Sequence, residues 1–468
     1  MSMSSNIKMS VSDFRAVKTA DIAIDGITLV AGENGCGKST LSKLLFYSIN
    51  AISNFESLVR KNLYHELRDV AQLLEIIVRD FSRSDEKSIK DRRRYLSEVY
   101  NLTELIQKKN VPLKGVQNSW IAFLDELEKV HDNNDPIYKE DFNDFDSINA
   151  SKLKNRNIRT MRMERIIKEV IQDASIESED SIDNHLNKDS STNNIFQKIK
   201  KLTISKFKLS REAIDNRPTS FIELELNRIF TEGNLPSDFS IHEFDELIFS
   251  MKNDSTSLLF SIQDAIYIDN PMMFAVESSD NPHWNDLRNL FQGDGSYTNE
   301  ITNIISNEVI NGDVESSEEL FVENNFKFKR SDNAVFNLLD MATGIKAFSI
   351  LQLLIKNGHL NEKTLLIIDE PESNLHPQWV VEYARVVVLL HKKFKVKLFL
   401  ASHNPDMVSA IRYISEEEGV LDSVNFYLAD KSDKKYSYNY RWLGHDIEPI
   451  FESFNIALSR ISEYGVSE

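Results

Sequence analysis

The chain is 468 residues long, enough for two or three ordinary domains or for one large domain that carries an insertion. Hydrophobic residues make up 41% and charged residues 27%, no apolar run approaches a membrane span, and Met1 to Ser10 lack a signal peptide's hydrophobic segment, so we expect a cytoplasmic globular protein. A net charge of -18 argues against nonspecific nucleic-acid binding by the whole surface, and the single cysteine, Cys36, rules out an intrachain disulfide.

A glycine-rich segment near the start of the chain fits G-x-x-x-x-G-K-[ST]. A short apolar run from Ile27 to Ala31 precedes it and a Leu-rich helical pattern follows it, which is the strand-loop-helix context that this motif requires. Its backbone N–H groups can surround a polyphosphate, Lys38 would reach the β- and γ-phosphates, and Ser39 would ligate Mg²⁺. The predicted nucleotide-binding residues are Gly32, Glu33, Asn34, Gly35, Cys36, Gly37, Lys38, Ser39 and Thr40.

The composition changes after the helix that follows this loop. From about Ala51 to Phe239 the chain is charged and nearly free of glycine, and its apolar residues recur at alternating steps of four and three, as on one stripe of a helix. The members of this stripe are Leu63, Leu67, Val70, Leu74, Ile77 and Phe81. The pattern is too short for a long coiled coil, so we predict an insertion of antiparallel helices at residues 51–239, between head segments at residues 1–50 and 240–468.

Three basic clusters lie within the insertion. They run from Lys87 to Arg94, from Lys152 to Lys168 (with Arg156, Arg159, Arg162 and Arg165) and from Lys198 to Lys208. Such clusters can bind the phosphate backbone of DNA or an acidic partner, but basic runs also form ordinary solvated helix faces. The sequence leaves both interpretations open.

Strand character returns after Ile241. Strands are predicted from Leu247 to Met251, from Ser257 to Ile262 and from Ala265 to Ile268, followed by a helix from Asn299 to Val309. Further along, the segment from Asn337 to Lys346 precedes a helix that ends at Asn357-Gly358, a typical C-terminal cap. We therefore predict that the α/β head resumes in this part of the chain.

Two carboxylates end the apolar run from Thr364 to Ile368. A continuous apolar run of this length is typical of a strand buried on both faces of a parallel sheet, and ligands of such sheets bind at the carboxyl ends of the strands. Asp369 is therefore placed to hold Mg²⁺, directly or through water, and Glu370 is placed to polarise the attacking water.

A second buried strand is predicted from Val396 to Ala401, and it ends in Ser402-His403. A histidine at this position can donate a hydrogen bond to the γ-phosphate or to the attacking water. We therefore assign catalytic roles to Lys38, Glu370 and His403. The sequence after His403 contains no second catalytic constellation.

The order of these motifs resembles the ABC-type ATPase heads of the SMC, Rad50 and RecF group. Three segments, Thr343 to Phe348, Ile367 to Pro377 and Ala401 to Pro405, most resemble PtuA-type ATPases of Septu and retron anti-phage systems. The resemblance implies an α/β fold, namely an ABC-type P-loop ATPase head with a large helical insertion. It also implies ATP and Mg²⁺ as ligands, a homodimer (or a higher oligomer) with ATP sandwiched between two heads, and a partner HNH nuclease of the PtuB type.

The resemblance further assigns two segments that would meet the nucleotide of a partner head. They are the signature residues, acting in trans, Ala342, Thr343, Gly344 and Lys346, and the D-loop residues Ser373, Asn374, Leu375 and His376. The usual signature reads Leu-Ser-Gly-Gly-Gln, so Ala342 replaces the serine that would contact the γ-phosphate. Losing a hydrogen bond to a charged group costs about 1.5–3 kcal/mol, which predicts slow hydrolysis with ATP as a state switch. The position of the Q-loop glutamine is not assigned.

Three functional interpretations remain open on the sequence alone. The first is an ATPase of an anti-phage system, which binds and slowly hydrolyses ATP to control an HNH nuclease. The alternative is a RecF- or Rad50-like repair factor that uses the basic clusters to hold DNA. In the first interpretation, too, the basic clusters are a candidate contact for DNA or a retron nucleic acid. The third is a scaffold that binds nucleotide without hydrolysis. A transporter ATPase is disfavoured because such proteins lack so long an insertion, and no membrane contact is expected.

Overall fold

The computed structural model describes most of the chain. The described residues are 7–80, 86–134, 195–230, 235–269, 282–293, 297, 299–317 and 325–454. The chain divides into two compact units, one of Met1–Ser53 with Pro218–Glu468 and one of Asn54–Arg217. We call the first unit the head and the second the helical unit.

A mixed sheet forms the centre of the head. Its strands are β1 (Ile7–Phe14), β2 (Val17–Ala23), β3 (Ile27–Ala31), β4 (Asp238–Glu243), β5 (Glu246–Ser250), β6 (Asp264–Ile268), β10 (Thr364–Asp369), β11 (Lys397–Ser402), β12 (Val424–Lys431) and β13 (Tyr438–Gly444). Within the described ranges the order is β5-β4-β1-β2-β13-β12-β3-β11-β10-β6. The strands β12, β3, β11, β10 and β6 pair in parallel, whereas β2, β1, β4 and β5 pair antiparallel.

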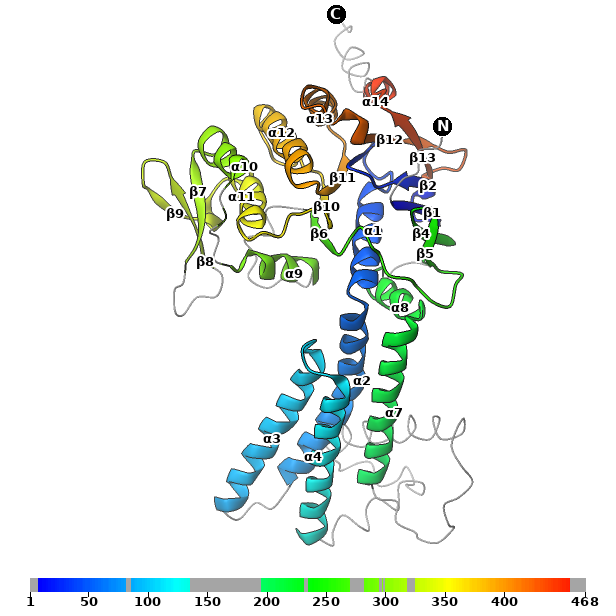
Figure 1. Cartoon of the computed structure of the whole chain (residues 1–468), viewed down its shortest axis with the longest axis vertical. Helices are drawn as coiled ribbons and strands as arrows, with labels where there is room; N and C mark the ends of the chain where they lie inside the picture. Colours follow the sequence, from blue (N-terminus) through cyan, green and yellow to red (C-terminus); the bar gives the residue numbers. More distant parts are fainter. Residues whose placement is uncertain are drawn as a thin grey trace, which may run out of the picture. The chain divides into compact units, whose positions relative to one another are not determined.

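Helices cover both faces of the parallel strands (Figure 1). On one face, α1 (Lys38–Ser53) packs against β6, β10 and β11, while α12 (Pro377–Phe394) packs against β11 on the other. Beside α12 lie α13 (Pro405–Glu417) and α11 (Thr343–Lys356), whose Phe348 ring contacts Trp379 and Tyr383 of α12. All six residues of β10 are buried, and its alternate side chains Leu366 and Ile368 belong to the cluster formed with α11 and α12. The predicted burial of this run on both faces is therefore confirmed.

The remaining head elements lie at the periphery of this sheet. They are α8 (Ser220–Ile229), α9 (Pro282–Phe291), α10 (Glu300–Ile304), the π-helix η4 (Ile305–Val309), the 3-10 helices η5 (Leu338–Asp340) and η6 (Leu421–Ser423), α14 (Glu448–Phe454) and the small sheet of β7 (Gly312–Ser317), β8 (Asn325–Arg330) and β9 (Val335–Asn337). The predicted helix at 299–309 is thus α10 continued by η4. Because α8 packs against α1, it belongs to the head although it precedes Phe239.

One predicted strand is wrong. Residues 257–262 are irregular instead of forming a strand. The reason is a buried carboxylate, Glu243, which accepts hydrogen bonds from the backbone N–H groups of Phe260 at 2.8 Å and Ser261 at 2.7 Å. Since a side chain satisfies these donors, the segment does not need a neighbouring strand to do so.

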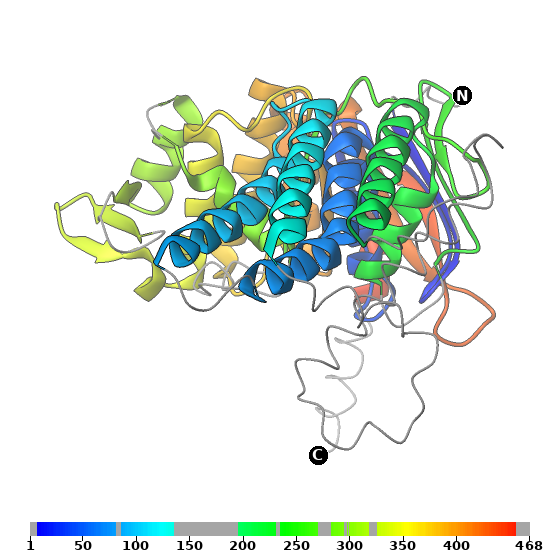
Figure 2. The same ribbon diagram turned by 90° about the horizontal axis from the view of Figure 1, so that it is seen from below.

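The helical unit consists of four long helices in its described part, seen from below in Figure 2. They are α2 (Phe55–Asp80), α3 (Glu86–Gln107), α4 (Leu113–Asn134) and α7 (Ile195–Asn216). The predicted stripe residues Leu63, Leu67, Val70 and Leu74 are buried in its core with Trp120 and Phe207, which confirms the helical period. Near the start of α2, Arg60 donates to the carbonyl of Ile106 at the end of α3, so these two helices run antiparallel.

These observations confirm the predicted fold class, an α/β ABC-type P-loop ATPase head with a large helical insertion. None of the helices in the described ranges combines the length and the apolar character that crossing a bilayer requires.

Candidate nucleotide site

The sheet topology brings the three predicted motifs to one edge. The phosphate loop follows β3, Asp369 ends β10 and Ser402 ends β11, and β11 lies between the other two strands. The three strands end at nearly the same height in the sheet, because Ser402 pairs with Ala31 and Asp369 pairs with Ala401. All three strands are parallel, so their carboxyl ends meet, as expected for a ligand site in an α/β sheet.

The phosphate loop has the conformation that its glycines predict. Gly35 and Gly37 have φ values of +83° and +98°, a region that side chains avoid, and a Cβ atom on Gly37 would lie 2.9 Å from Val17 Cγ2. Lys38 begins α1, is only 5% exposed and donates from Nζ to the carbonyl oxygens of Gly32 at 2.8 Å and Glu33 at 3.0 Å. The lysine and the helix N-terminus thus face the interior of the same loop.

Asp369 has the properties of a magnesium ligand. Burial raises the pKa of its carboxyl group to about 6, and the negative charge of Glu370 adds to this effect, while Ser39 and Tyr267 oppose it. Tyr267 donates to Oδ2 at 3.2 Å, whereas Oδ1 is buried and accepts no hydrogen bond from the described residues. A buried, unpartnered carboxylate oxygen beside the Ser39 hydroxyl fits a hard cation that takes oxygen ligands.

Glu370 adopts a backbone conformation that is uncommon for a residue with a side chain. Its φ is +51°, and its N–H donates to the carbonyl of Ala401 at 2.8 Å, which ties the turn after β10 to β11. Strained residues of this kind concentrate at functional sites. The side chain is 44% exposed, and its Oε1 lies 3.8 Å from Nδ1 of His403. The structure therefore brings Glu370 and His403, two of the three predicted catalytic side chains, together at the sheet edge.

His403 lies between two carboxylates. Its Nδ1 is 3.3 Å from Oε1 of Glu372 and 3.8 Å from Oε1 of Glu370, and its side chain is 38% exposed. Glu372 was not assigned a role from the sequence, although it lies in the same motif as Glu370. No spacing rule distinguishes it there, because its contact with His403 depends on the pairing of β10 with β11.

Two tyrosines of β13 hold the phosphate loop, and sequence reasoning missed both. Tyr438 donates to Oε1 of Glu33 at 2.6 Å, and Tyr440 donates to the carbonyl of Cys36 at 2.9 Å. The Tyr438 bond, together with Lys431 at 2.9 Å, lowers the pKa of Glu33, so this carboxylate stays charged and paired. The alternation of tyrosines at 436, 438 and 440 was the available signal, but it does not reveal which loop they contact.

The predicted signature segment does not join the phosphate loop of its own chain. Ala342 is the N-cap of α11 and supplies no side-chain cap, while Lys346 is 7% exposed. A Cβ atom on Gly344 would lie 2.4 Å from the Trp379 ring, so this glycine permits α11 to approach α12. The ring of Phe348 on α11 packs against Trp379 and Tyr383 of α12, so the segment belongs to the part of the head formed with α12 (Figure 1).

The predicted D-loop residues connect β10 with α12. Asn374 has a φ of +60° and donates from Nδ2 to the hydroxyl of Ser373 at 3.2 Å. His376 caps α12 by accepting from the N–H of Gln378 at 3.4 Å. Asn374 and His376 are exposed, and Leu375 is partly buried against the head core. The loop thus presents two polar side chains to the surface.

The basic clusters are only partly described. Residues 152–168 lie outside the described residues, as do the side chains of residues 87–91. In the first cluster Arg94 pairs with Glu126, and in the third Lys200 pairs with Asp125 and Glu128. These pairings favour the helix-face interpretation for Arg94 and Lys200, because a paired cation is a poorer ligand for phosphate.

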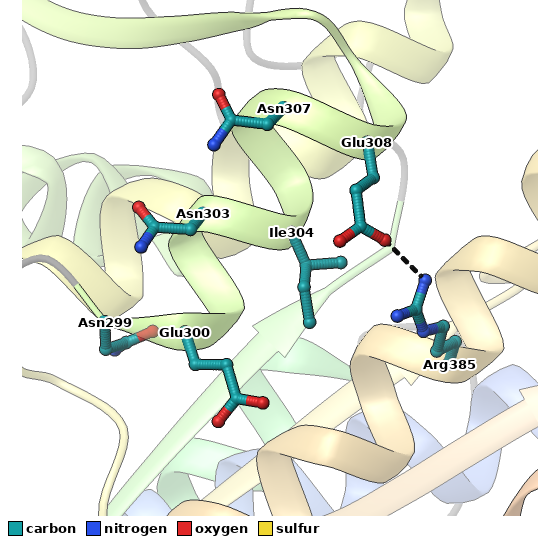
Figure 3. Close-up of a pocket in the computed structure, with 7 residues that line it drawn as sticks. All are labelled: Asn299, Glu300, Asn303, Ile304, Asn307, Glu308 and Arg385. Atoms are coloured by element: carbon teal, nitrogen blue, oxygen red, sulfur yellow. Dashed lines mark hydrogen bonds and ion pairs between the residues drawn. The ribbon is translucent and has the colours of Figure 1, made fainter.

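A separate polar groove lies between α10 and α12 (Figure 3). Its volume is about 510 Å³, and it is lined by Asn299, Glu300, Asn303, Ile304, Asn307, Glu308 and Arg385. Arg385 bonds to Glu308 at 2.9 Å across the groove. None of these residues belongs to the predicted site, and the lining contains no nucleophile or histidine.

The fold and the site together define a P-loop ATPase head. A family model described as "AAA domain, putative AbiEii toxin, Type IV TA system" matches residues 168–409, just over half of the chain. The chain belongs to this family. Membership implies ATP as the nucleotide, usually with Mg²⁺, and no curated protein matches the chain.

Several solved structures of ATPase heads are similar to the chain at low identity. The Smc head with an extended coiled coil from Pyrococcus furiosus, bound to the C-terminal domain of ScpA, is 11% identical over 97% of this chain and 98% of that chain, with a TM-score of 0.31. An SmcHead bound to the C-winged helix domain of ScpA is 10% identical over 95% of this chain and 98% of that chain, with a TM-score of 0.32. The structure of cbiO1 from Clostridium perfringens, part of an ABC transporter complex, is 13% identical over 52% of this chain and 82% of that chain, with a TM-score of 0.24. The assignment of this chain rests on its own strand order and on the family match.

Proposed function

We propose that this ATPase binds ATP at the carboxyl ends of β3, β10 and β11, hydrolyses it slowly, and uses the bound nucleotide to control a partner HNH nuclease of the PtuB type in an anti-phage system. The observation that carries the proposal is the meeting of Lys38, Asp369, Glu370 and His403 at one edge of the sheet. The nuclease and the defence role are supported by the motif resemblance, and the family description, which names a toxin, is compatible with them.

The chain's own residues divide the chemistry between them. The loop N–H groups and Lys38 bind the β- and γ-phosphates, and Asp369 Oδ1 with the Ser39 hydroxyl would hold Mg²⁺, which when bound neutralises charge on the transferred phosphoryl group. Glu370 orients and polarises the attacking water. His403 lies beside Glu370 and contacts either this water or the γ-phosphate.

A second copy of the chain completes the proposed site. At the start of α11, Gly344 packs against Trp379 and Leu375. We infer from the motif resemblance that the signature residues Ala342 to Lys346 act on the partner's nucleotide, and that ATP holds two heads together as a homodimer. Ala342 supplies no hydroxyl for the γ-phosphate, which supports slow turnover.

The test is ATP hydrolysis by the wild type and by Glu370→Gln. We expect the substitution to lower kcat by about 100-fold or more, the range for loss of a general base, while ATP binding persists. Lys38→Ala should lose ATP binding, and Glu417→Gln, an exposed glutamate on α13, serves as the matched control with unchanged turnover. Equal rates for the wild type and Glu370→Gln would show that Glu370 is not the catalytic carboxylate.

A further inference from the structure

Glu372 is a buried carboxylate for which the proposed mechanism has no use. Its side chain is only 3% exposed, and its Oε1 accepts hydrogen bonds from the Ser402 hydroxyl and from the N–H of His403, both at 2.9 Å. The same oxygen lies 3.3 Å from Nδ1 of His403. A buried carboxylate is costly unless several donors face it, so its position calls for a further donor.

Two buried atoms without hydrogen-bond partners indicate where that donor would come from. Among the described residues, neither Oε2 of Glu372 nor Nδ1 of His403 has a hydrogen-bond partner, and both atoms are buried. An unpaired buried acceptor and an unpaired buried donor on neighbouring side chains satisfy one another after a small rotation of the ring, provided that Nδ1 carries the proton. A proton on Nε2 alone would leave Nδ1 as a second acceptor facing two carboxylates.

We propose that Glu372 is a positioning residue for His403, which keeps a proton on Nδ1 and fixes the ring so that Nε2 is the atom directed at the nucleotide. The proposal rests on the proposed function for what Nε2 then contacts, but the Glu372–His403 pairing itself does not. A carboxylate that accepts a hydrogen bond from one ring nitrogen in this way fixes the tautomer of a functional histidine.

The position of Glu372 in the chain gives this contact a second consequence. Glu372 immediately precedes Ser373 and Asn374 of the predicted D-loop, and its own carbonyl accepts from the N–H of Leu375 at 3.1 Å. One side chain therefore links the histidine at the end of β11 to the loop that would face a partner head.

The substitution Glu372→Gln separates positioning from simple packing. The amide has the same size, and its oxygen can still accept from the Ser402 hydroxyl and the His403 N–H at the Oε1 position. Its NH₂ group then takes the place of Oε2, the oxygen that the rotated ring would bond to, and offers Nδ1 a donor instead of an acceptor. Nδ1 must then become an acceptor, and the proton moves to Nε2. With the ring in the wrong tautomer, we expect kcat to fall at least about tenfold with little change in KM for ATP.

The decisive experiment is ¹⁵N NMR of histidine-labelled, nucleotide-free protein, with His403 assigned by its loss in His403→Ala. We expect the neutral ring to carry its proton on Nδ1 in the wild type and in the control Glu417→Gln, and on Nε2 in Glu372→Gln. An Nε2 proton in the wild type overturns the proposal, even if Glu372→Gln does not fold. The same tautomer in wild type and Glu372→Gln overturns it as well.

Turnover gives an independent readout. If Glu372 acts through His403, Glu372→Gln should lower kcat in the wild-type background and have no further effect in His403→Ala. An equal loss in both backgrounds would make Glu372 a merely structural residue. A wild type that does not hydrolyse ATP would refute the proposed function and leave the NMR outcome to decide on Glu372.

Discussion

Burial makes the ionised form of the Asp369 carboxyl group unfavourable in the nucleotide-free protein. Burial raises its pKa from 3.8 to about 6, so the folded chain binds this proton more tightly than the unfolded chain does. The contribution of Asp369 to stability therefore falls as pH rises from about 4 through 6, and the full penalty is present above that range. A cation at Oδ1 would offset the penalty, which links metal binding to stability.

Asp369→Asn should consequently stabilise the nucleotide-free protein while removing magnesium-dependent turnover. The amide mimics the protonated acid, and the shift from 3.8 to about 6 corresponds to a gain of up to about 3 kcal/mol in the free energy of unfolding at pH 7.5. Urea denaturation at pH 7.5 and pH 5 measures it, with the exposed Asp422→Asn as control. A gain of equal size at both pH values would contradict the role of the buried charge.

At the residue scale, the sequence predicted the members of local motifs and missed those that depend on tertiary contacts. Lys38, Asp369 and Glu370 could be assigned because strand-loop context and residue type suffice for them. Tyr438, by contrast, bonds to Glu33 from 405 positions away. Such a contact follows from the placement of β13 beside β2, which no local pattern specifies.

The helix α11 lacks a side-chain cap at its N-terminus. Helix starts are stabilised when the N-cap side chain accepts a hydrogen bond from the backbone, and Ala342 cannot do so. The neighbouring helix starts are better capped, since His376 accepts a bond at the start of α12 and Asn404 accepts two at the start of α13. The weak signature noted in the sequence is thus also a weak cap.

Ala342→Ser should repair both defects. A serine N-cap stabilises a helix by about 1 kcal/mol relative to alanine, and its hydroxyl would add a hydrogen bond to the partner's γ-phosphate. We expect a higher Tm without nucleotide and tighter ATP-dependent association. Ala342→Gly is the matched control, because glycine is a better N-cap than alanine but has no hydroxyl. If serine and glycine tighten association equally, the γ-phosphate contact is absent.

For whole helices and strands, capping signals and apolar periodicity predicted most of the boundaries. The prediction failed where a side chain, instead of a neighbouring strand, accepts the backbone hydrogen bonds. Gly358, with a φ of +73°, ends α11 as the Asn357-Gly358 signal predicts. The irregular segment at 257–262 read as a strand because its apolar residues suit one. The backbone N–H groups of Phe260 and Ser261 are satisfied by Glu243, however, and the sequence contains no sign of that contact.

At the scale of the whole molecule, the order of the strands could not be predicted from the sequence. The helical insertion was visible as a repeat of apolar positions, and the burial of β10 and β11 was visible as continuous apolar runs. The placement of β11 between β3 and β10 depends on pairings between strands far apart in the chain. That placement puts His403 beside Glu370 and makes the site one unit.

We have proposed that each chain holds half of a nucleotide site that a second copy completes. The most direct measurement is sedimentation of Glu370→Gln, which should bind ATP and hydrolyse it too slowly to disassemble, with and without ATP and Mg²⁺. We predict a monomer without nucleotide and a dimer, or a higher oligomer, with it, and no ATP-dependent change for Lys38→Ala. Saturation of Glu370→Gln by ATP with no change in mass would contradict the claim.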